Sequence, residues 1–182
     1  MIKISAKSKT ISGSINLEAS KSISNRLLII RELCDNKFDI ENLSNAKDTR
    51  ILTKILNDFK SQNDIDCEDA GTALRFALAF LATKDGNWAV SGSKRMHERP
   101  IKPLIDCLLE LGAEIKYLNK NGYPPIEIKG GKLKSKKLII KGNISSQFIS
   151  ALLMIAPKLK NGIHLEIVSK VLSKPYIEMT LG

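Results

Sequence analysis

The sequence predicts a mixed α/β (α+β) fold of repeated βαβαββ units in which sheets pack around buried helices. Segments that alternate polar and apolar residues, as half-buried strands do, are interleaved with segments whose apolar residues recur at helical spacing. The pattern returns after about 60–65 residues, which indicates an internal repeat. A chain of 182 residues with 43% hydrophobic and 26% charged residues can bury such a core without a metal or a disulfide.

The first unit is expected over residues 13–67. Its elements should be, in order, a strand at 14–17, a polar turn at 19–24, a helix at 25–33, a strand at 38–43 and a helix at 48–59. The remaining stretch, 61–67, is short for two strands. We therefore expect the hairpin that closes this unit to be trimmed.

The second unit is expected over residues 68–130. Its elements should be a helix at 72–83, a strand at 87–91, a helix at 100–111, and two strands at 113–118 and 125–129 around a turn at 119–124. The first of these helices is almost continuously apolar, which predicts burial on all sides. Pro100 should begin the second helix and Gly112 should follow its last turn as a C-cap.

The third unit is expected over residues 131–182, with a strand at 137–141, a helix at 146–156, a strand at 162–168 and the start of a helix at Pro175. Because so short a final helix has little surface to bury, we expect the chain to be a fragment that ends inside this unit. The lysine-rich run 129–141 alternates with Leu and Ile, which predicts the solvated face of a hairpin.

Composition narrows the classes of function. The net charge of +10 suits nucleic acid, an anionic membrane or a phosphorylated small molecule as partner. Only 5% of the residues are aromatic, and no RNA-recognition signature is present, which disfavours nucleic acid. Three widely spaced cysteines without a CxxC pair predict a reduced, cytoplasmic chain without a structural metal. We also expect no cofactor. No apolar run approaches about 18 residues, so we expect no membrane span.

Hydroxyl and basic residues gather where the expected helices begin. Lys21, Ser22 and Arg26 surround the first start, where free backbone N–H groups and the helix dipole favour an anion. The simpler interpretation is an ordinary serine N-cap with exposed basic neighbours. Ser145, Ser146 and Gln147 open another, largely apolar helix, and capping alone explains one of these serines.

Three further expected helix starts carry hydroxyl or basic residues. Gly71 and Thr72 open the apolar helix, and Arg75 lies one turn further on, where a buried guanidinium needs a partner such as Asp69 or Asp48. The other candidates at these starts are Arg95, Arg99, Ser173 and Tyr176. Because a repeat brings equivalent helix starts to one side of the molecule, the five together predict a site for a small molecule that carries phosphate and carboxylate groups.

Six strings of the sequence are similar to the N-terminal half of one enzyme family. They are EASKSISNR, DAGTALRF, RMHERPI, GYPPIEIKG, ISSQFISALLMIAP and SKPYIEMTL, and they follow the same order along essentially all of the chain. The chain thereby resembles 5-enolpyruvylshikimate-3-phosphate (EPSP) synthase, the shikimate-pathway enzyme of chorismate and aromatic amino acid biosynthesis. SKSISNR, ISSQF and SKPYI are together highly specific for it.

The resemblance implies transfer of enolpyruvyl from phosphoenolpyruvate to the 5-hydroxyl of shikimate 3-phosphate, by addition and then elimination of phosphate. Lys21, Gly71 and Arg99 would contact phosphoenolpyruvate. Shikimate 3-phosphate would be held by Ser22, Arg26, Ser145, Ser146, Ser173 and Tyr176, with Gln147 between both ligands. Thr72, also a substrate-binding residue, and Arg75 would shape the site. Asp48 and Asp69 would support it.

The resemblance also implies the enolpyruvyl transferase fold of two lobes, of which this chain is the N-terminal one. The general acid and base residues would lie in the other lobe, so we expect the chain alone to bind shikimate 3-phosphate without turnover, as a monomer. Residues 1–12 would hold a strand that normally belongs to the other lobe, and 13–182 would form the lobe itself.

Two departures from the family pattern leave subclass and response to the inhibitor glyphosate open. Asp69 replaces a more frequent asparagine, and Phe76 replaces a frequent proline. Two alternative functions also remain open: a sister enolpyruvyl transferase that acts on UDP-N-acetylglucosamine, and a basic nucleic-acid-binding module, because RNA 3′-phosphate cyclases use similar units.

Overall fold

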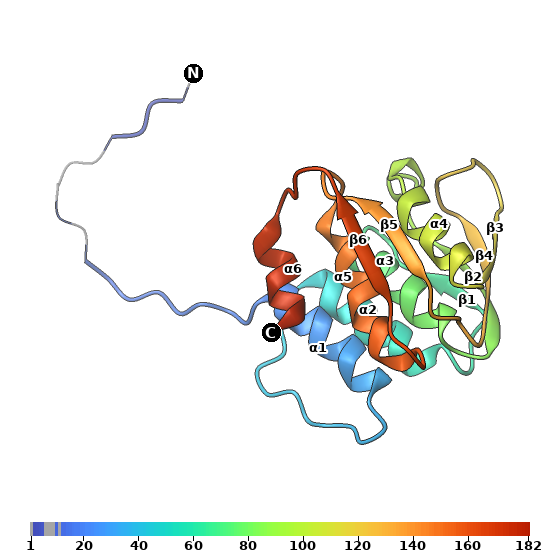
Figure 1. Ribbon diagram of the computed structural model, residues 1–182. Helices are drawn as coiled ribbons and strands as arrows, with labels where there is room; N and C mark the ends of the chain where they lie inside the picture. Colours follow the sequence, from blue (N-terminus) through green and yellow to red (C-terminus); the bar gives the residue numbers. More distant parts are fainter. Residues whose placement is uncertain (1, 6–9, 11) are drawn as a thin grey trace.

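Figure 1 shows the computed structural model, which describes residues 2–5, 10 and 12–182. Within these residues the helices are α1 (Lys21–Leu33), α2 (Lys47–Asp58), α3 (Gly71–Ala82), α4 (Lys102–Glu110), α5 (Ser146–Ile155) and α6 (Lys174–Leu181). The strands are β1 (Asp64–Asp66), β2 (Gly86–Ser91), β3 (Glu114–Tyr117), β4 (Ile126–Gly130), β5 (Lys137–Lys141) and β6 (His164–Val168). Single 3-10 turns follow at Met96–Glu98 and Ala156–Lys158.

Helix α3 lies at the centre of the molecule. All of its residues are buried, including Phe76 and Phe80, and it contacts α1, α2, α4 and α5 as well as strands β2 and β4 (Figure 1). The prediction that this continuously apolar helix is buried on all sides is therefore confirmed. Because α3 is enclosed, its N-terminus is fixed relative to the helices around it.

One four-stranded sheet covers α3 and α4. The strand order is β1-β2-β4-β3, with β1 parallel to β2 and the other pairs antiparallel. Residues 64–130 thus form the predicted βαβαββ arrangement, but it begins before the expected unit 68–130, because β1 pairs with β2 and completes it. The expectation of a trimmed hairpin at 61–67 was wrong: this stretch forms the single strand β1, and its Ile65 pairs with Val90 of β2.

The second sheet consists of β5 and β6, which are parallel and joined through α5. The predicted hairpin in the run 129–141 was wrong, because β4 and β5 belong to different sheets. The alternation was interpreted correctly: Leu138 and Ile140 are buried, while the lysines of β5 are exposed. Residues 131–136 carry the chain from one sheet to the other.

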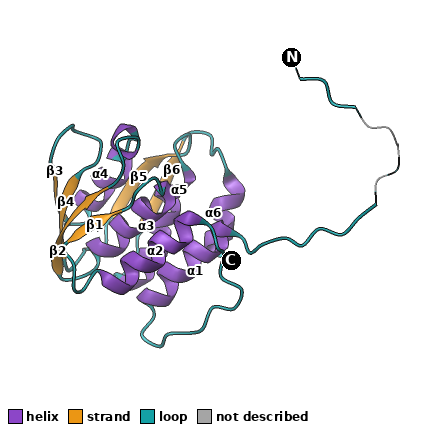
Figure 2. Ribbon diagram, turned by 180° about the vertical axis from the view of Figure 1, so that it is seen from behind, coloured by secondary structure: helices purple, strands orange, loops and turns teal. Residues whose placement is uncertain are grey.

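The two strands predicted for the first unit, at 14–17 and 38–43, do not form. Ile15 and Leu17 are 85% and 89% exposed, and an alternating segment without a paired neighbour does not make a strand. As Figure 2 shows, α1 and α2 lie on a face that no described strand covers. The strand expected within 1–12 falls partly outside the described residues, and 2–5, 10 and 12 form none.

Two helix starts differ from the prediction by more than one residue. Helix α1 begins at Lys21, four residues before the expected Asn25, because the side chain of Ser20 accepts a hydrogen bond from the N–H of Ile23. Helix α4 begins at Lys102 with Pro103 in its first turn, so Pro100 lies in the preceding loop. Gly112 follows α4 with φ 102°, which confirms its predicted role after the last turn.

Candidate functional site

A pocket of about 220 Å³ lies where α1, α3 and α5 begin. Eight residues that the sequence had singled out line it: Lys21, Ser22, Arg26, Thr72, Ser145, Ser146, Gln147 and Tyr176. Three helix N-termini thus face one small volume, and each contributes free N–H groups and the positive end of its dipole. The lining is rich in hydroxyls and cations, a combination suited to an anionic, hydroxylated ligand.

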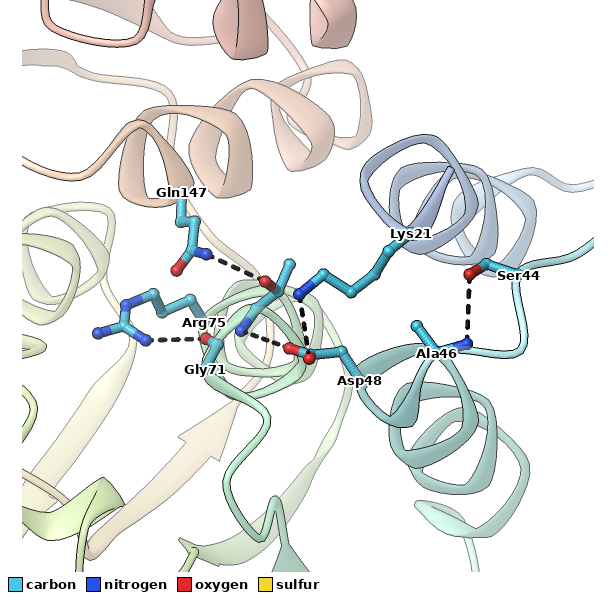
Figure 3. Close-up of polar contacts among 8 residues, drawn as sticks. Lys21, Ser44, Ala46, Asp48, Gly71, Arg75 and Gln147 are labelled. Carbon is cyan, nitrogen blue, oxygen red and sulfur yellow. Dashed lines mark hydrogen bonds and ion pairs between the residues drawn. The ribbon is translucent and has the colours of Figure 1, made fainter. Parts of the chain in front are cut away.

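Asp48 joins the starts of α1 and α3. Its carboxylate lies 3.2 Å from Lys21 Nζ and accepts a hydrogen bond of 3.3 Å from the N–H of Thr72 (Figure 3). Ala70, at the N-cap position of α3, makes no side-chain cap, so Asp48 supplies that cap from α2. The arrangement holds the Lys21 ammonium beside the first turn of α3.

Gln147 connects α5 to the same point. Its Nε2 donates to Thr72 Oγ1 at 3.0 Å, so Lys21, Asp48 and Gln147 converge on the first turn of α3 (Figure 3). Ser145 caps α5 by accepting a hydrogen bond from the N–H of Gln147. The serine therefore caps the helix as the simpler interpretation required, and it also lines the pocket.

Arg26 is 5% exposed and forms one wall of the pocket. It donates to the Thr180 and Ser150 hydroxyls at 2.7 and 2.8 Å and to the carbonyl oxygens of Ser22 and Tyr176 at 2.8 and 2.9 Å. Burial lowers its pKa below the ordinary value. Arg26 thus ties α1 to α5 and α6, and no carboxylate is among these partners.

A second group of cations surrounds Gly71. The guanidinium of Arg99 lies where a side chain at this position would begin, and Arg75 Nη1 lies 2.8 Å from the same point. Gly71 is therefore required for this close approach. Arg99, Asp69, Arg95 and Met96 line a neighbouring hollow of about 200 Å³.

Arg75 is not paired with either carboxylate that the sequence offered. It donates to the carbonyl oxygens of Gly71 at 2.8 Å and Pro100 at 3.2 Å, and its guanidinium lies over the ring of Phe148. Burial, assisted by the nearby charge of Arg99, lowers the pKa of Arg75 to about 10. The charge is held by backbone dipoles and an aromatic face.

Asp69 contacts Ser93 and Lys47 and not Arg75. The Ser93 hydroxyl donates a short hydrogen bond to it, Lys47 lies 3.7 Å away, and these contacts lower its pKa. Ser173, another predicted residue, precedes α6 with φ 57° and is not among the residues that line the 220 Å³ pocket. Sequence reasoning missed Ser150 and Thr180, although Ser150 follows Ser146 by one helical turn.

Among the described residues, no group of three His, Cys, Asp or Glu side chains could hold a metal ion, and no helix is long and apolar enough to cross a membrane. A larger groove of about 560 Å³ lies between α1, α5 and α6, but Ile30, Leu33 and Leu153 give it a mainly apolar lining. The smaller pocket carries the convergent polar groups.

A pocket formed by helix N-termini, cations and hydroxyls is typical of proteins that bind small phosphorylated molecules. Comparison with known proteins identifies the family. Residues 5–64 and 57–182 match the family EPSP synthase (3-phosphoshikimate 1-carboxyvinyltransferase), and the chain belongs to it. The prediction of the family from six sequence strings is confirmed.

Individual relatives agree with this assignment. The chain is 46% identical to the 3-phosphoshikimate 1-carboxyvinyltransferase of Bacteroides fragilis (strain YCH46), over 94% of this chain and 41% of that protein. It is 39% identical to the 3-phosphoshikimate 1-carboxyvinyltransferase of Sulfurovum sp. (strain NBC37-1), over 94% of this chain and 46% of that protein. The chain therefore spans less than half the length of these relatives.

The fold is also that of a solved relative. The structure of EPSP synthase from Acinetobacter baumannii superposes with a TM-score of 0.78 at 16% sequence identity, over 91% of this chain and 42% of that one. At this identity the likeness concerns the fold, and it confirms the predicted mixed fold of helices and sheets.

Proposed function

We propose that this chain forms the half of a 3-phosphoshikimate 1-carboxyvinyltransferase that binds shikimate 3-phosphate. The complete reaction transfers enolpyruvyl from phosphoenolpyruvate to the 5-hydroxyl of shikimate 3-phosphate and releases phosphate. The observation that carries the proposal is the pocket at the starts of α1, α3 and α5, which brings together eight predicted residues from four separate stretches of sequence.

The chemistry of the pocket fits a phosphate at one end and ring hydroxyls at the other. Ser145 and Ser146 can donate hydroxyl hydrogens to a phosphate at the start of α5, where N–H groups are free. Arg26 and Tyr176 lie at the wall formed with α6 and would contact the shikimate ring. Gln147, already held by Thr72, would lie between both ligands.

Phosphoenolpyruvate would bind beside this pocket, against Lys21, Gly71 and Arg99. The guanidinium of the exposed Arg99 meets the open face of Gly71, and Arg75 adds a buried cation there. A planar guanidinium matches a carboxylate or phosphate with two hydrogen bonds, and a lysine adds a point charge. Asp69 at the edge of this cluster would repel an anion, which bears on the response to glyphosate.

The chain alone would bind shikimate 3-phosphate without turnover, because the proton-transfer groups would come from the other half of the enzyme. It would act in the cytoplasm as a monomer, without cofactor, metal, nucleic acid or membrane. These statements rest on the family and on the character of the pocket, with its lining of small-molecule ligand groups.

Competition binding tests the proposal. Isothermal titration of the chain with shikimate 3-phosphate should give saturable 1:1 binding that UDP-N-acetylglucosamine and a short RNA do not displace. Displacement by the nucleotide sugar would favour the sister transferase. Binding of the RNA that weakens steeply with salt would favour the nucleic-acid module.

A further inference from the structure

A basic pocket lies at the opposite end of the helix bundle from the proposed substrate site. It has a volume of about 330 Å³ and is lined by Thr83, Lys84, Gly131, Lys132, Leu133, Lys158, Leu159 and Lys160. Thr83 follows the last turn of α3, whereas Thr72 of the substrate pocket lies in its first turn. Twelve helical residues separate the two sites by roughly 18 Å.

The lysines of this pocket are largely uncompensated. In the described part of the chain, Lys158 pairs with Asp35, whose side chain is 93% exposed, while Lys84, Lys132 and Lys160 make no ion pair. Two further acids lie nearby: Glu32, whose charge acts on Lys84 and which pairs with Lys37, and Asp85, whose carboxylate lies beside Gly131. Part of the lysine-rich run 129–141, which takes no part in the substrate site, therefore lines this pocket.

Lys84 is the most confined of these cations. Its ammonium lies 4.8 Å from the centre of the Phe80 ring and 3.5 Å from the carbonyl oxygen of Glu32. Burial and the charge of Lys158 lower its pKa. Helix C-termini attract cations, and the carbonyl at the end of α1 accounts for one contact of Lys84. It does not account for Lys132 and Lys160, which line the same hollow.

We propose that this pocket binds a small anion that carries two or more phosphate groups. Its volume suits a small molecule, and Leu133 and Leu159 contribute apolar surface to an otherwise cationic lining. No aromatic side chain lines it, so it offers nothing on which a nucleic-acid base could stack. An oligophosphate would neutralise several ammonium groups at once and relieve their mutual repulsion.

Isothermal titration with tripolyphosphate tests the inference. The test variant is Lys132→Gln with Lys160→Gln, and the matched control is Lys54→Gln with Lys116→Gln, which removes the same charge from exposed positions outside the pocket. The wild-type chain should bind one tripolyphosphate, the test variant about tenfold more weakly, and the control almost as tightly as wild type.

Three results would overturn the inference. Equal weakening in both variants would show attraction to net charge alone, and displacement by shikimate 3-phosphate would place the anion in the substrate pocket. Absence of saturable binding would show that the pocket does not bind an oligophosphate. Thermal unfolding of both variants verifies that they remain folded, and the first and third results leave the proposed substrate site untouched.

Discussion

Two buried guanidinium groups, Arg26 and Arg75, lie at the proposed substrate site, Arg26 in the pocket wall and Arg75 beside Gly71. Neither is paired with a carboxylate, and burial lowers the pKa of both. A buried cation without a counter-ion costs stability, and a bound anion would offset that cost. The two differ in what they hold: Arg26 joins three helices by side-chain hydrogen bonds, whereas Arg75 bonds to two carbonyl oxygens.

This difference predicts unequal effects on stability. Arg26→Met should lower the free energy of unfolding by about 2–3 kcal/mol, because hydrogen bonds from a charged group to α5 and α6 are lost. Arg75→Met should change it by no more than about 1 kcal/mol, because a buried charge is replaced by an apolar chain. Urea unfolding measures both, with Arg50→Met on the exposed face of α2 as control. The reverse order would contradict the assignment.

Arg75 also predicts a dependence on pH. Its folded-state pKa of about 10 lies below the ordinary 12.5. Above pH 10 the folded chain therefore loses this proton, whereas the unfolded chain keeps it. The free energy of unfolding of the wild type relative to Arg75→Met should therefore rise as the pH increases through 10. Urea titrations at several alkaline pH values measure the difference. A fall over that range would contradict the burial of a charged Arg75.

The cysteines should differ in reactivity. Burial raises the pKa of Cys107 to about 11 and also raises that of Cys67, whereas Cys34 is exposed after α1. Because the thiolate is the reactive form, a disulfide reagent at about pH 8 should modify Cys34 rapidly and the others only after unfolding. Rapid labelling that persists in Cys34→Ser would show that the interior is open.

At the scale of elements, close packing between a helix and a strand makes one glycine indispensable. A side chain at Gly130, the last residue of β4, would overlap the carbonyl oxygens of Leu81 and Lys84 at the end of α3. Gly130→Ala should therefore destabilise the chain by about 1–3 kcal/mol. At the neighbouring Gly131 the nearest atom is 3.6 Å away, so Gly131→Ala should be tolerated. Thermal unfolding distinguishes them, and equal effects would contradict this packing.

The elements also show which predictions the sequence supports. Helices with a long apolar pattern, such as α3, were predicted within a residue or two because their burial follows from their own residues. Strand partners depend on distant segments: the alternation of β5 was clear, but whether it pairs with β4 or β6 was not. The side-chain partners of Arg75 were missed for the same reason, because Pro100 and Phe148 meet it only in the folded chain.

At the scale of the whole molecule, the repeat aligns helix starts on one side. The anion-binding groups that the sequence placed at five helix starts form two clusters in the structure. One is the pocket at α1, α3 and α5, and the other is the guanidinium cluster at Gly71. Ser173, just before α6, lines neither that pocket nor the Arg99 hollow, whereas Tyr176 in the first turn of the same helix lines the pocket. Sequence alone could not separate these two groups, because their division depends on how the helices pack.

Binding of shikimate 3-phosphate to the pocket is the central claim, and phosphorus NMR tests it most directly. The ligand resonance should shift saturably on addition of the wild-type chain and of a control with Ser12→Ala and Ser61→Ala, both exposed serines. With Ser145→Ala and Ser146→Ala, the shift should be lost. An unchanged shift in that variant would contradict the phosphate site at the start of α5, and absence of binding to the wild type would contradict the claim itself.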